Sequence, residues 1–196
     1  MARKLSPEKR ETFLNAALKL FVANGAQTTS TAKIAQEAGT AAGTLFIYFP
    51  TKQDLIDELI LKISHEQADN TKAHLTPELS ARDTFLTIWN SSIYWFLENR
   101  LAYQFVQQVR DSGVISAEVT EETGKLFDYY FLAVQKGLEE GCIKPYALEL
   151  VGTYLYYDIV AVMNHLMAQP DPNNQEETIR VGFELFWDGI KMTNDE

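Results

Sequence analysis

The chain has 196 residues, of which 46% are hydrophobic, and a formal net charge of -10 at pH 7. This length and apolar content suffice for one or two domains with a sizeable core. No run of about 18 apolar residues occurs, and the basic N-terminus has no apolar stretch behind it, so we expect neither a membrane span nor a secretory signal. The single cysteine excludes an internal disulfide and suits a reducing compartment, so we expect a cytoplasmic protein.

Charge is distributed unevenly along the chain. Residues 1–52 carry seven basic and three acidic groups, which gives them a net charge of +4. Residues 53–196 carry 10 basic and 24 acidic groups, which gives a net charge of -14. The difference indicates an N-terminal part that tolerates polyanions and an acidic remainder that repels them. A chance fluctuation of charge is the alternative interpretation of this feature alone.

In the N-terminal half, apolar residues recur at helical spacing and no strand-like alternation persists. Ser6-Pro7 is an N-cap followed by proline, and it predicts a first helix that ends at Asn24-Gly25. Short helices are expected over 31–38 and 42–48. Two capping boxes of the form Ser/Thr-x-x-Asp begin at Thr51 and Ser80, and each predicts the start of a longer helix.

In the C-terminal half, the same periodicity predicts helices over 101–110, 116–140, 145–168 and 175–191. The segment "QPDPNN" reads as the loop before the last of them. The fold class is therefore all-α, with about nine helices. We divide the chain near the start of the fourth helix, into a three-helix domain over 1–52 and a larger helical bundle over 53–196.

A helix, a tight turn that contains Gly39 and a second short helix together predict a helix-turn-helix. The apolar residues expected to hold its two helices together are Ile34, Ala35, Ala38, Leu45 and Phe49. The opposite face of the second helix carries small residues, which let the backbone approach DNA, and hydroxyls, which can contact phosphates or bases. Lys52 lies in the first turn of the next helix, a position that suits a phosphate. A plain helical hairpin is the alternative interpretation.

Four segments at ordered spacing make a more specific match. They are "AALKLFVANG", "TTSTAKIAQEAG", "GTLFIYF" and "TKQDLI". With these segments, the first 60 or so residues resemble the DNA-binding domain of the tetracycline-repressor (TetR) family, a domain that by the family's pattern extends to about residue 67. The resemblance implies a homodimer, a palindromic double-stranded DNA operator and a C-terminal domain that binds a small molecule and then releases DNA.

The resemblance also assigns DNA contacts to particular residues. The implied DNA-binding residues are Thr31, Lys33, Ala42, Gly43, Thr44, Phe46, Ile47, Tyr48 and Lys52. Position 46 is often tyrosine in the family, so Phe46 lacks a hydroxyl contact. Ile47 replaces a commonly polar or cationic residue, and an apolar contact with a thymine methyl group is expected there instead.

Residues 85–157 contain more aromatic side chains than a bundle of this size needs, with polar groups among them, which is typical of a small-molecule pocket. The predicted ligand-binding residues are Trp89, Phe96, Tyr130, Tyr157, Asn164 and His165. We expect an apolar compound, aromatic or cationic, because ring faces attract flat rings and cations and Asp158 favours positive charge. Aromatic core packing is the alternative for each residue. A polar pair within an apolar helix, Asn164 and His165, is expected to need a partner or ligand.

The last two predicted helices have extended apolar faces that suit a four-helix dimer interface. The predicted interface residues are Leu155, Ile159, Val162, Phe183, Phe186 and Ile190. Glycines seven residues apart, Gly182 and Gly189, allow close approach of helices. The alternative is that these faces pack only within one chain.

The three histidines lack metal-ligand spacing and no nucleophile or nucleotide-binding motif occurs, so we expect no metal, no cofactor and no enzyme activity. The predicted function is a ligand-responsive DNA-binding transcriptional regulator, a repressor released by a small molecule. The alternatives from other classes are a helical enzyme that uses a carboxylate and a protein–protein adaptor. Neither alternative predicts affinity for DNA.

Overall fold

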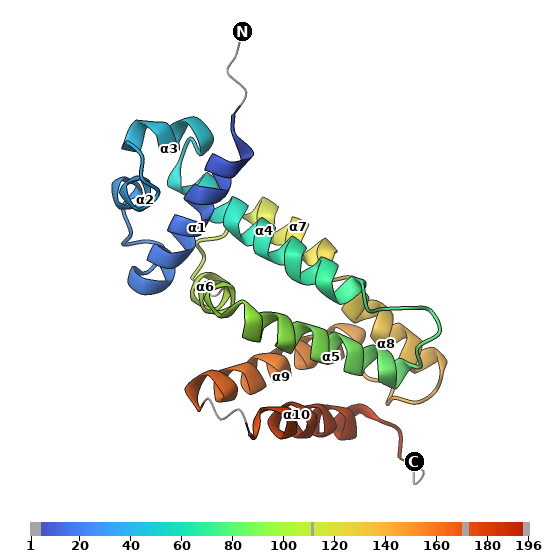
Figure 1. Cartoon of the computed structure of the whole chain (residues 1–196). Coiled ribbons are helices and arrows are strands. Elements are labelled where there is room, and N and C mark those ends of the chain that lie inside the picture. Colours follow the sequence, from blue (N-terminus) through green and yellow to red (C-terminus); the bar gives the residue numbers. More distant parts are fainter. Residues whose placement is uncertain (1–4, 111, 170–172, 194–196) are drawn as a thin grey trace. The chain divides into compact units, whose positions relative to one another are not determined.

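A computed structural model describes residues 5–110, 112–169 and 173–193. Within these ranges the chain forms ten helices and no strand, which confirms the all-α fold class. The helices are α1 (Pro7–Asn24), α2 (Thr31–Glu37), α3 (Ala42–Tyr48), α4 (Lys52–Lys72), α5 (Ala81–Glu98), α6 (Arg100–Arg110), α7 (Ala117–Leu126), α8 (Tyr129–Glu139), α9 (Leu148–Ala168) and α10 (Gln175–Ile190) (Figure 1). 

The helices group into two compact units. The first unit comprises Met1–His65 and Asn99–Lys125, and the second comprises Glu66–Glu98 and Leu126–Glu196. The first unit therefore contains α1–α3, most of α4, and α6 with most of α7, whereas α5, α8, α9 and α10 belong to the second. This grouping describes packing, and the functional division at residue 52 stays a prediction.

The single helix predicted over 116–140 is wrong, because two helices, α7 and α8, occupy that range. Between them the backbone N–H groups of Tyr130 and Phe131 bond to the carbonyls of Phe127 and Asp128, each three residues back. Bonds of this spacing tighten the chain into a turn and interrupt the α-helical ladder. The turn itself contains neither glycine nor proline, and Gly124 lies inside α7, so no residue marks the position of the break. 

The helix starts predicted from Ser6, Thr51 and Ser80 are confirmed by their capping hydrogen bonds. The Ser6 hydroxyl accepts a hydrogen bond from the Lys9 N–H at 3.2 Å, which caps α1. The Thr51 N–H donates to the Asp54 carboxylate at 2.8 Å, and the Asp54 N–H donates back to the Thr51 hydroxyl at 3.1 Å. Each cap satisfies backbone groups that have no partner inside the helix, which is why these residue types fix where a helix begins.

In the first unit, α6 packs against α1. The rings of Phe21 and Phe105 are stacked with centroids 5.7 Å apart, and both are fully buried. The Gln108 side chain donates a hydrogen bond to the carbonyl of Val22 at 2.9 Å. Helix α6 therefore stabilises the same helix against which the helix-turn-helix is built.

In the second unit, the core lies where α5, α9 and α10 meet. Trp89 is fully buried, and its indole N–H donates to the Ile179 carbonyl at 3.0 Å. A Cβ added at Gly182 would lie 2.4 Å from Val162 Cγ2 and 2.9 Å from Trp89 Cζ2. Only glycine lets α9 and α10 approach this closely without displacing the tryptophan or the valine.

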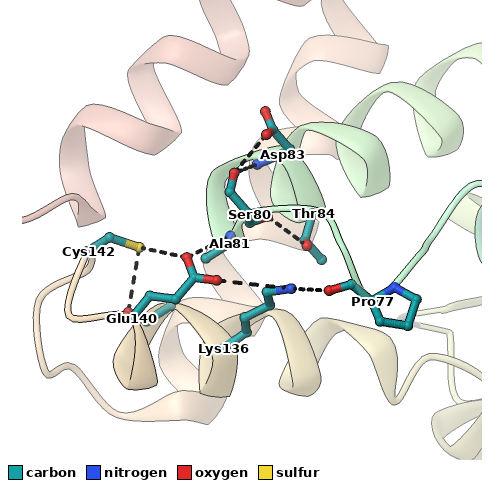
Figure 2. A network of polar contacts seen from close by, with 9 residues as sticks. Pro77, Ser80, Ala81, Asp83, Thr84, Lys136, Glu140 and Cys142 are labelled. Carbon is teal, nitrogen blue, oxygen red and sulfur yellow. Dashed lines mark hydrogen bonds and ion pairs between the residues drawn. The ribbon is translucent and has the colours of Figure 1, made fainter.

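Polar contacts join the end of α8 to the start of α5 (Figure 2). The Glu140 carboxylate accepts a hydrogen bond from the Ala81 N–H at 2.9 Å, beside the Ser80–Asp83 capping box. The Lys136 ammonium donates to the Pro77 carbonyl at 2.9 Å. Burial and the nearby carboxylate of Glu140 raise the pKa of the Cys142 thiol, which keeps it protonated at neutral pH. 

Candidate nucleic-acid interface

The helix-turn-helix predicted from residues 31–48 is confirmed. Its buried face consists of Ile34, Ala35, Leu45 and Phe49, with each side chain at most 1% exposed. Gly39 lies in the turn with φ +68°, a left-handed conformation that favours glycine. These contacts fix α3 against α2 and leave the opposite face of α3 open. 

The open face of α3 is apolar. Ala42 and Gly43 are exposed, and the side chains of Phe46 and Ile47 are 45% and 63% exposed. Thr44 is half-buried. Because much of the surface of these two large apolar side chains faces water, that surface is available for contact with another molecule.

Tyr48 was expected to face outward, but it is half-buried and does not project freely. Its ring packs against Phe13 with centroids 5.5 Å apart. Its hydroxyl accepts a hydrogen bond from the Ser6 N–H at 3.2 Å. Tyr48 therefore ties the end of α3 to the start of α1, while its hydroxyl hydrogen can still be donated to another acceptor.

Arg10 holds α1, α3 and α4 together, and sequence reasoning did not identify it. Its Nε donates to Glu58 Oε1 at 2.6 Å and its Nη2 bonds to the other carboxylate oxygen of Glu58. A longer hydrogen bond of 3.5 Å joins its Nη1 to the Tyr48 carbonyl, and the guanidinium lies over the Phe49 ring. The hydrogen bonds to Glu58 raise the pKa of Arg10. Because Arg10 and Glu58 are 48 residues apart, no local pattern could pair them.

The predicted phosphate-binding residues lie on α2 and α4. Thr31 is half-buried and Lys33 is exposed, and the Lys33 N–H is capped by the Ser30 hydroxyl at 3.3 Å. The Lys52 ammonium donates to the Gln27 carbonyl at 2.6 Å, and burial lowers its pKa. An ammonium has three N–H groups, so this contact leaves Lys52 able to bind a phosphate as well.

The six predicted ligand-binding residues differ widely in burial. Trp89 belongs to the core, Phe96 and Tyr130 are half-buried, and Tyr157 is 51% exposed. Asn164 and His165 were expected to lie deep in an apolar helix, and this is wrong, because both are exposed on α9. Exposed polar groups can form hydrogen bonds with water, so Asn164 and His165 do not require a ligand as a hydrogen-bond partner.

The polar side chains that the second unit does bury are different ones. Gln67, Thr71 and Ser92 are at most 3% exposed, and the Gln67 amide donates to the Ser92 hydroxyl at 3.0 Å and to the Thr71 hydroxyl at 3.2 Å. The Tyr129 hydroxyl lies 3.5 Å from Gln67 Oε1, and burial raises the pKa of Tyr129. The sequence pattern that could have identified these buried polar residues lies on α4, where Gln67 and Thr71 continue the apolar stripe of Ile60 at helical spacing.

Five of the six predicted dimer-interface residues are buried within the chain. Leu155, Ile159, Phe183, Phe186 and Ile190 are at most 6% exposed. Val162, half-buried, packs against Gly182 of the same chain. The structure of one chain does not test a dimer, but it shows that these side chains have little surface left to offer a partner.

Other side chains of α9 and α10 are exposed and line a groove of about 520 Å³. Leu150, Tyr154 and Leu185 on its edges are 53%, 60% and 73% exposed. Trp89 and Phe186 form part of its floor, and Asp158 is its only charged lining residue. Burial raises the pKa of the Asp158 carboxyl.

Among residues 5–110, 112–169 and 173–193, no helix combines the length and hydropathy that a membrane span requires. Over the same part of the chain, no group of three or more histidine, cysteine, aspartate or glutamate side chains is arranged to hold a metal ion.

Comparison with known proteins identifies the family. Residues 13–59 match the profile of bacterial regulatory proteins of the tetR family. The HTH-type transcriptional regulator LuxR of Vibrio harveyi is 31% identical over an alignment 144 residues long, which covers 68% of this chain and 69% of that protein.

Solved structures agree with this assignment. A putative tetR family transcription regulator from Shewanella sp. PV-4 is 28% identical, with a TM-score of 0.85 over 94% of this chain and 99% of that one. FadR from Bacillus subtilis, solved in complex with stearoyl-CoA, is 17% identical with a TM-score of 0.76, over 92% and 98% of the two chains, and shares the fold. The protein belongs to the TetR family of bacterial regulatory proteins and is a DNA-binding transcription regulator.

Proposed function

We propose that the protein represses transcription by binding a palindromic operator as a homodimer and is released from DNA by a small apolar effector. The observation that carries the proposal is the open face of α3, which exposes Phe46 and Ile47 in a segment with a net positive charge. The recognition helices of a dimer enter successive major grooves, about 34–36 Å apart.

The proposed DNA contacts divide into two kinds. Ala42, Gly43, Thr44, Phe46, Ile47 and Tyr48 of α3 would face base edges or the adjoining backbone. Thr31, Lys33 and Lys52 would contact phosphates, which position the protein without reading sequence. The exposed ammonium of Lys33 and the remaining N–H groups of Lys52 support these roles.

For the dimer, the proposal keeps the two helices predicted from the sequence and changes the residues. Leu150, Tyr154 and Leu185 surround an apolar groove on α9 and α10, and a second copy of the chain would cover it. A monomer seldom leaves an apolar surface of this kind uncovered, which supports an interface here. The side chains first assigned to the interface would then form the layer directly beneath it.

For the effector, the proposed site lies in the second unit, and the six residues predicted from the sequence remain its candidates. Helix α4 provides the route to DNA, because one continuous helix carries both Lys52 and the buried Gln67–Thr71 pair. An effector must bind the DNA-competent and the released forms with different affinities, or it cannot regulate. A polar group of the effector that competes for the hydrogen bonds of Gln67 would provide such a difference.

DNA binding is tested by a gel shift with DNA from upstream of the protein's own gene, together with sedimentation to count subunits. We expect one dimer per palindrome. Lys33→Ala should weaken binding to all DNA sequences alike and lower the salt dependence by about one counterion. Arg180→Ala removes an exposed cation of the second unit, paired with Glu177, and should leave affinity unchanged. A folded dimer that prefers no DNA sequence would contradict the proposal.

The effector is tested by tryptophan fluorescence followed by the gel shift. Dyes and quaternary ammonium compounds serve as probes, with stearoyl-CoA as a long-chain probe. We expect the active compound to quench fluorescence and to release the operator over the same concentration range. Gln67→Leu should keep the quenching and uncouple it from release. A compound that binds without changing operator affinity would show a pocket but no switch.

A further inference from the structure

The exposed face of α3 lacks the side chains that read bases by paired hydrogen bonds. Its seven residues include no amide, carboxylate, ammonium or guanidinium group. Instead, Phe46 and Ile47 are 45% and 63% exposed. We infer that these two side chains read the operator through the C5-methyl groups of thymine. The inference rests on the DNA-binding function proposed above and specifies the base chemistry that the site recognises.

The usual paired contacts are not available to α3. Guanine is read by arginine or lysine, adenine by asparagine or glutamine, and cytosine by a carboxylate. The only polar side chains of α3 are Thr44 and Tyr48. Thr44 is half-buried, and the Tyr48 hydroxyl already accepts the Ser6 N–H at 3.2 Å. A single hydroxyl contacts one atom, which distinguishes base pairs less well than a bidentate contact.

The thymine methyl is the one apolar group that the major groove displays on an unmodified base. Contact with an exposed isoleucine or phenylalanine removes apolar surface of both partners from water. A buried methyl contributes a factor of about four to an equilibrium constant. Four-fold discrimination at each contacted thymine, multiplied over the two half-sites of a palindrome, amounts to about 15-fold.

The geometry of α3 favours two neighbouring base pairs. Consecutive residues of a helix project about 100° apart, so Phe46 and Ile47 cannot both contact the same methyl group head-on. At the start of the helix, Ala42 and Gly43 are exposed, and a Cβ added at Gly43 would meet nothing within 4 Å. Their small size lets the backbone come close enough for the two larger side chains to reach the base edges. The inferred half-site therefore carries thymines at adjacent base pairs, on either strand.

The experiment begins with selection of operators from a random duplex library by the full-length protein. Each thymine of the enriched half-site is then replaced singly by deoxyuridine, which keeps the hydrogen-bonding groups and lacks the methyl. We expect about a four-fold loss of affinity at each contacted position when one half-site is changed, and about 15-fold when both are changed.

Alanine variants then assign each methyl to its reader. Ile47→Ala or Phe46→Ala should bind the thymine and deoxyuridine duplexes equally at the position that the lost side chain reads. Both side chains are exposed, so the variants should melt like the wild type. Lys33→Ala is the matched control, because loss of a phosphate contact should weaken both duplexes alike and keep their ratio.

The outcomes separate this inference from the function on which it rests. An enriched operator that tolerates deoxyuridine everywhere overturns the inference and leaves DNA binding intact. A deoxyuridine penalty that persists in both alanine variants also overturns it, because the methyl is then read by another residue. If a folded dimer enriches no sequence at all, the proposed function itself fails.

Discussion

The helix pairs α2–α3 and α9–α10 both expose large apolar side chains, but they differ in what lies beneath. In α3, the exposed Ile47 lies next to a single buried layer that includes Leu45, and the helix has only seven residues. In α10, the exposed Leu185 adjoins Phe186, which belongs to an aromatic core shared with α5. The short pair therefore presents a small, separate surface, whereas any change on the long pair is close to the core. Substitutions of the exposed side chains on α3 should therefore change DNA binding without changing stability, whereas substitutions on α10 should change dimer formation and stability together.

The largest expected effect contrasts two neighbours on α10. Phe186 is 4% exposed and packs with Phe85 at a centroid distance of 5.6 Å, so Phe186→Ala should cost about 3–5 kcal/mol of unfolding free energy. Leu185 is 73% exposed, so Leu185→Ala should change stability of the protomer by less than about 0.5 kcal/mol. Urea unfolding monitored by circular dichroism measures both.

The same neighbours separate folding from dimer formation. Leu185→Asp should weaken the proposed dimer by about 30-fold or more, because a charge would be placed against the apolar surface that the second chain covers. Leu132→Asp, on α8, changes an apolar side chain that is 59% exposed and lies outside the groove lining, and it serves as the control. Sedimentation reports the outcome. A Leu185→Asp protein that remains as tight a dimer as the wild type would place the interface elsewhere.

The next effect contrasts two glycines of α10. Gly182→Ala would bring a Cβ to 2.4 Å from Val162 Cγ2, and the resulting strain should cost about 1–3 kcal/mol. Gly189→Ala meets nothing within 4 Å, and removing a glycine from a helix should stabilise it by about 0.5–1 kcal/mol. Thermal unfolding of the two variants should therefore shift in opposite directions. Equal shifts would mean that the close approach of α9 and α10 does not depend on Gly182.

On the short pair, Tyr48→Phe tests how α3 is held against α1. The substitution keeps the ring contact with Phe13 and removes the acceptor of the Ser6 N–H, which should cost about 0.5–1.5 kcal/mol. Operator affinity should fall further than this loss of stability explains if the hydroxyl also donates to DNA. Thr12→Ala, which removes an exposed hydroxyl of α1 that donates to the Glu8 carbonyl at 2.8 Å, is the control. Affinity and melting temperature of both variants, measured together, separate the two roles.

The comparison also explains what sequence reasoning could and could not predict. The Ser6, Thr51 and Ser80 caps and the Gly39 turn depend on residues within a few positions of one another, so the helix starts and the helix-turn-helix were predictable. What covers the apolar faces of α9 and α10 was not predictable, because periodicity marks a face as apolar and does not say whether it packs within the chain or against a partner.

Contacts between distant residues were equally hidden from the sequence. The Arg10–Glu58 pair and the Gln67–Ser92 hydrogen bond join residues that are 48 and 25 positions apart. The prediction that Asn164 and His165 need a ligand was wrong for a related reason. Polar residues within an apolar helix indicate either a buried polar site or the solvent-exposed face of the helix. Only the packing of the other helices decides between these two.

The smallest expected effect concerns Asp158, the charged residue in the α9–α10 groove. Burial raises the pKa of its carboxyl above the ordinary value of 3.8. A carboxyl whose pKa is higher in the folded than in the unfolded state binds protons more readily when folded. Its ionised form therefore disfavours the fold, and this penalty is absent well below pH 3.8 and grows as pH rises through the folded-state pKa.

Asp158→Asn should consequently stabilise the protein at pH 7 and have less effect at pH 4. Because the carboxylate is partly exposed and screened by water, the gain should be only about 0.5 kcal/mol, or roughly 1–2 °C in melting temperature. Asp69→Asn, which removes an exposed carboxylate of α4, is the control for the loss of one negative charge. In the proposed dimer a second chain over the groove would desolvate Asp158 further. The stabilisation by Asp158→Asn at pH 7 should then be larger. A variant that instead weakens the dimer at pH 7 would show that a cation of the partner subunit pairs with this carboxylate, and the groove would then be held by charge as well as by apolar contact.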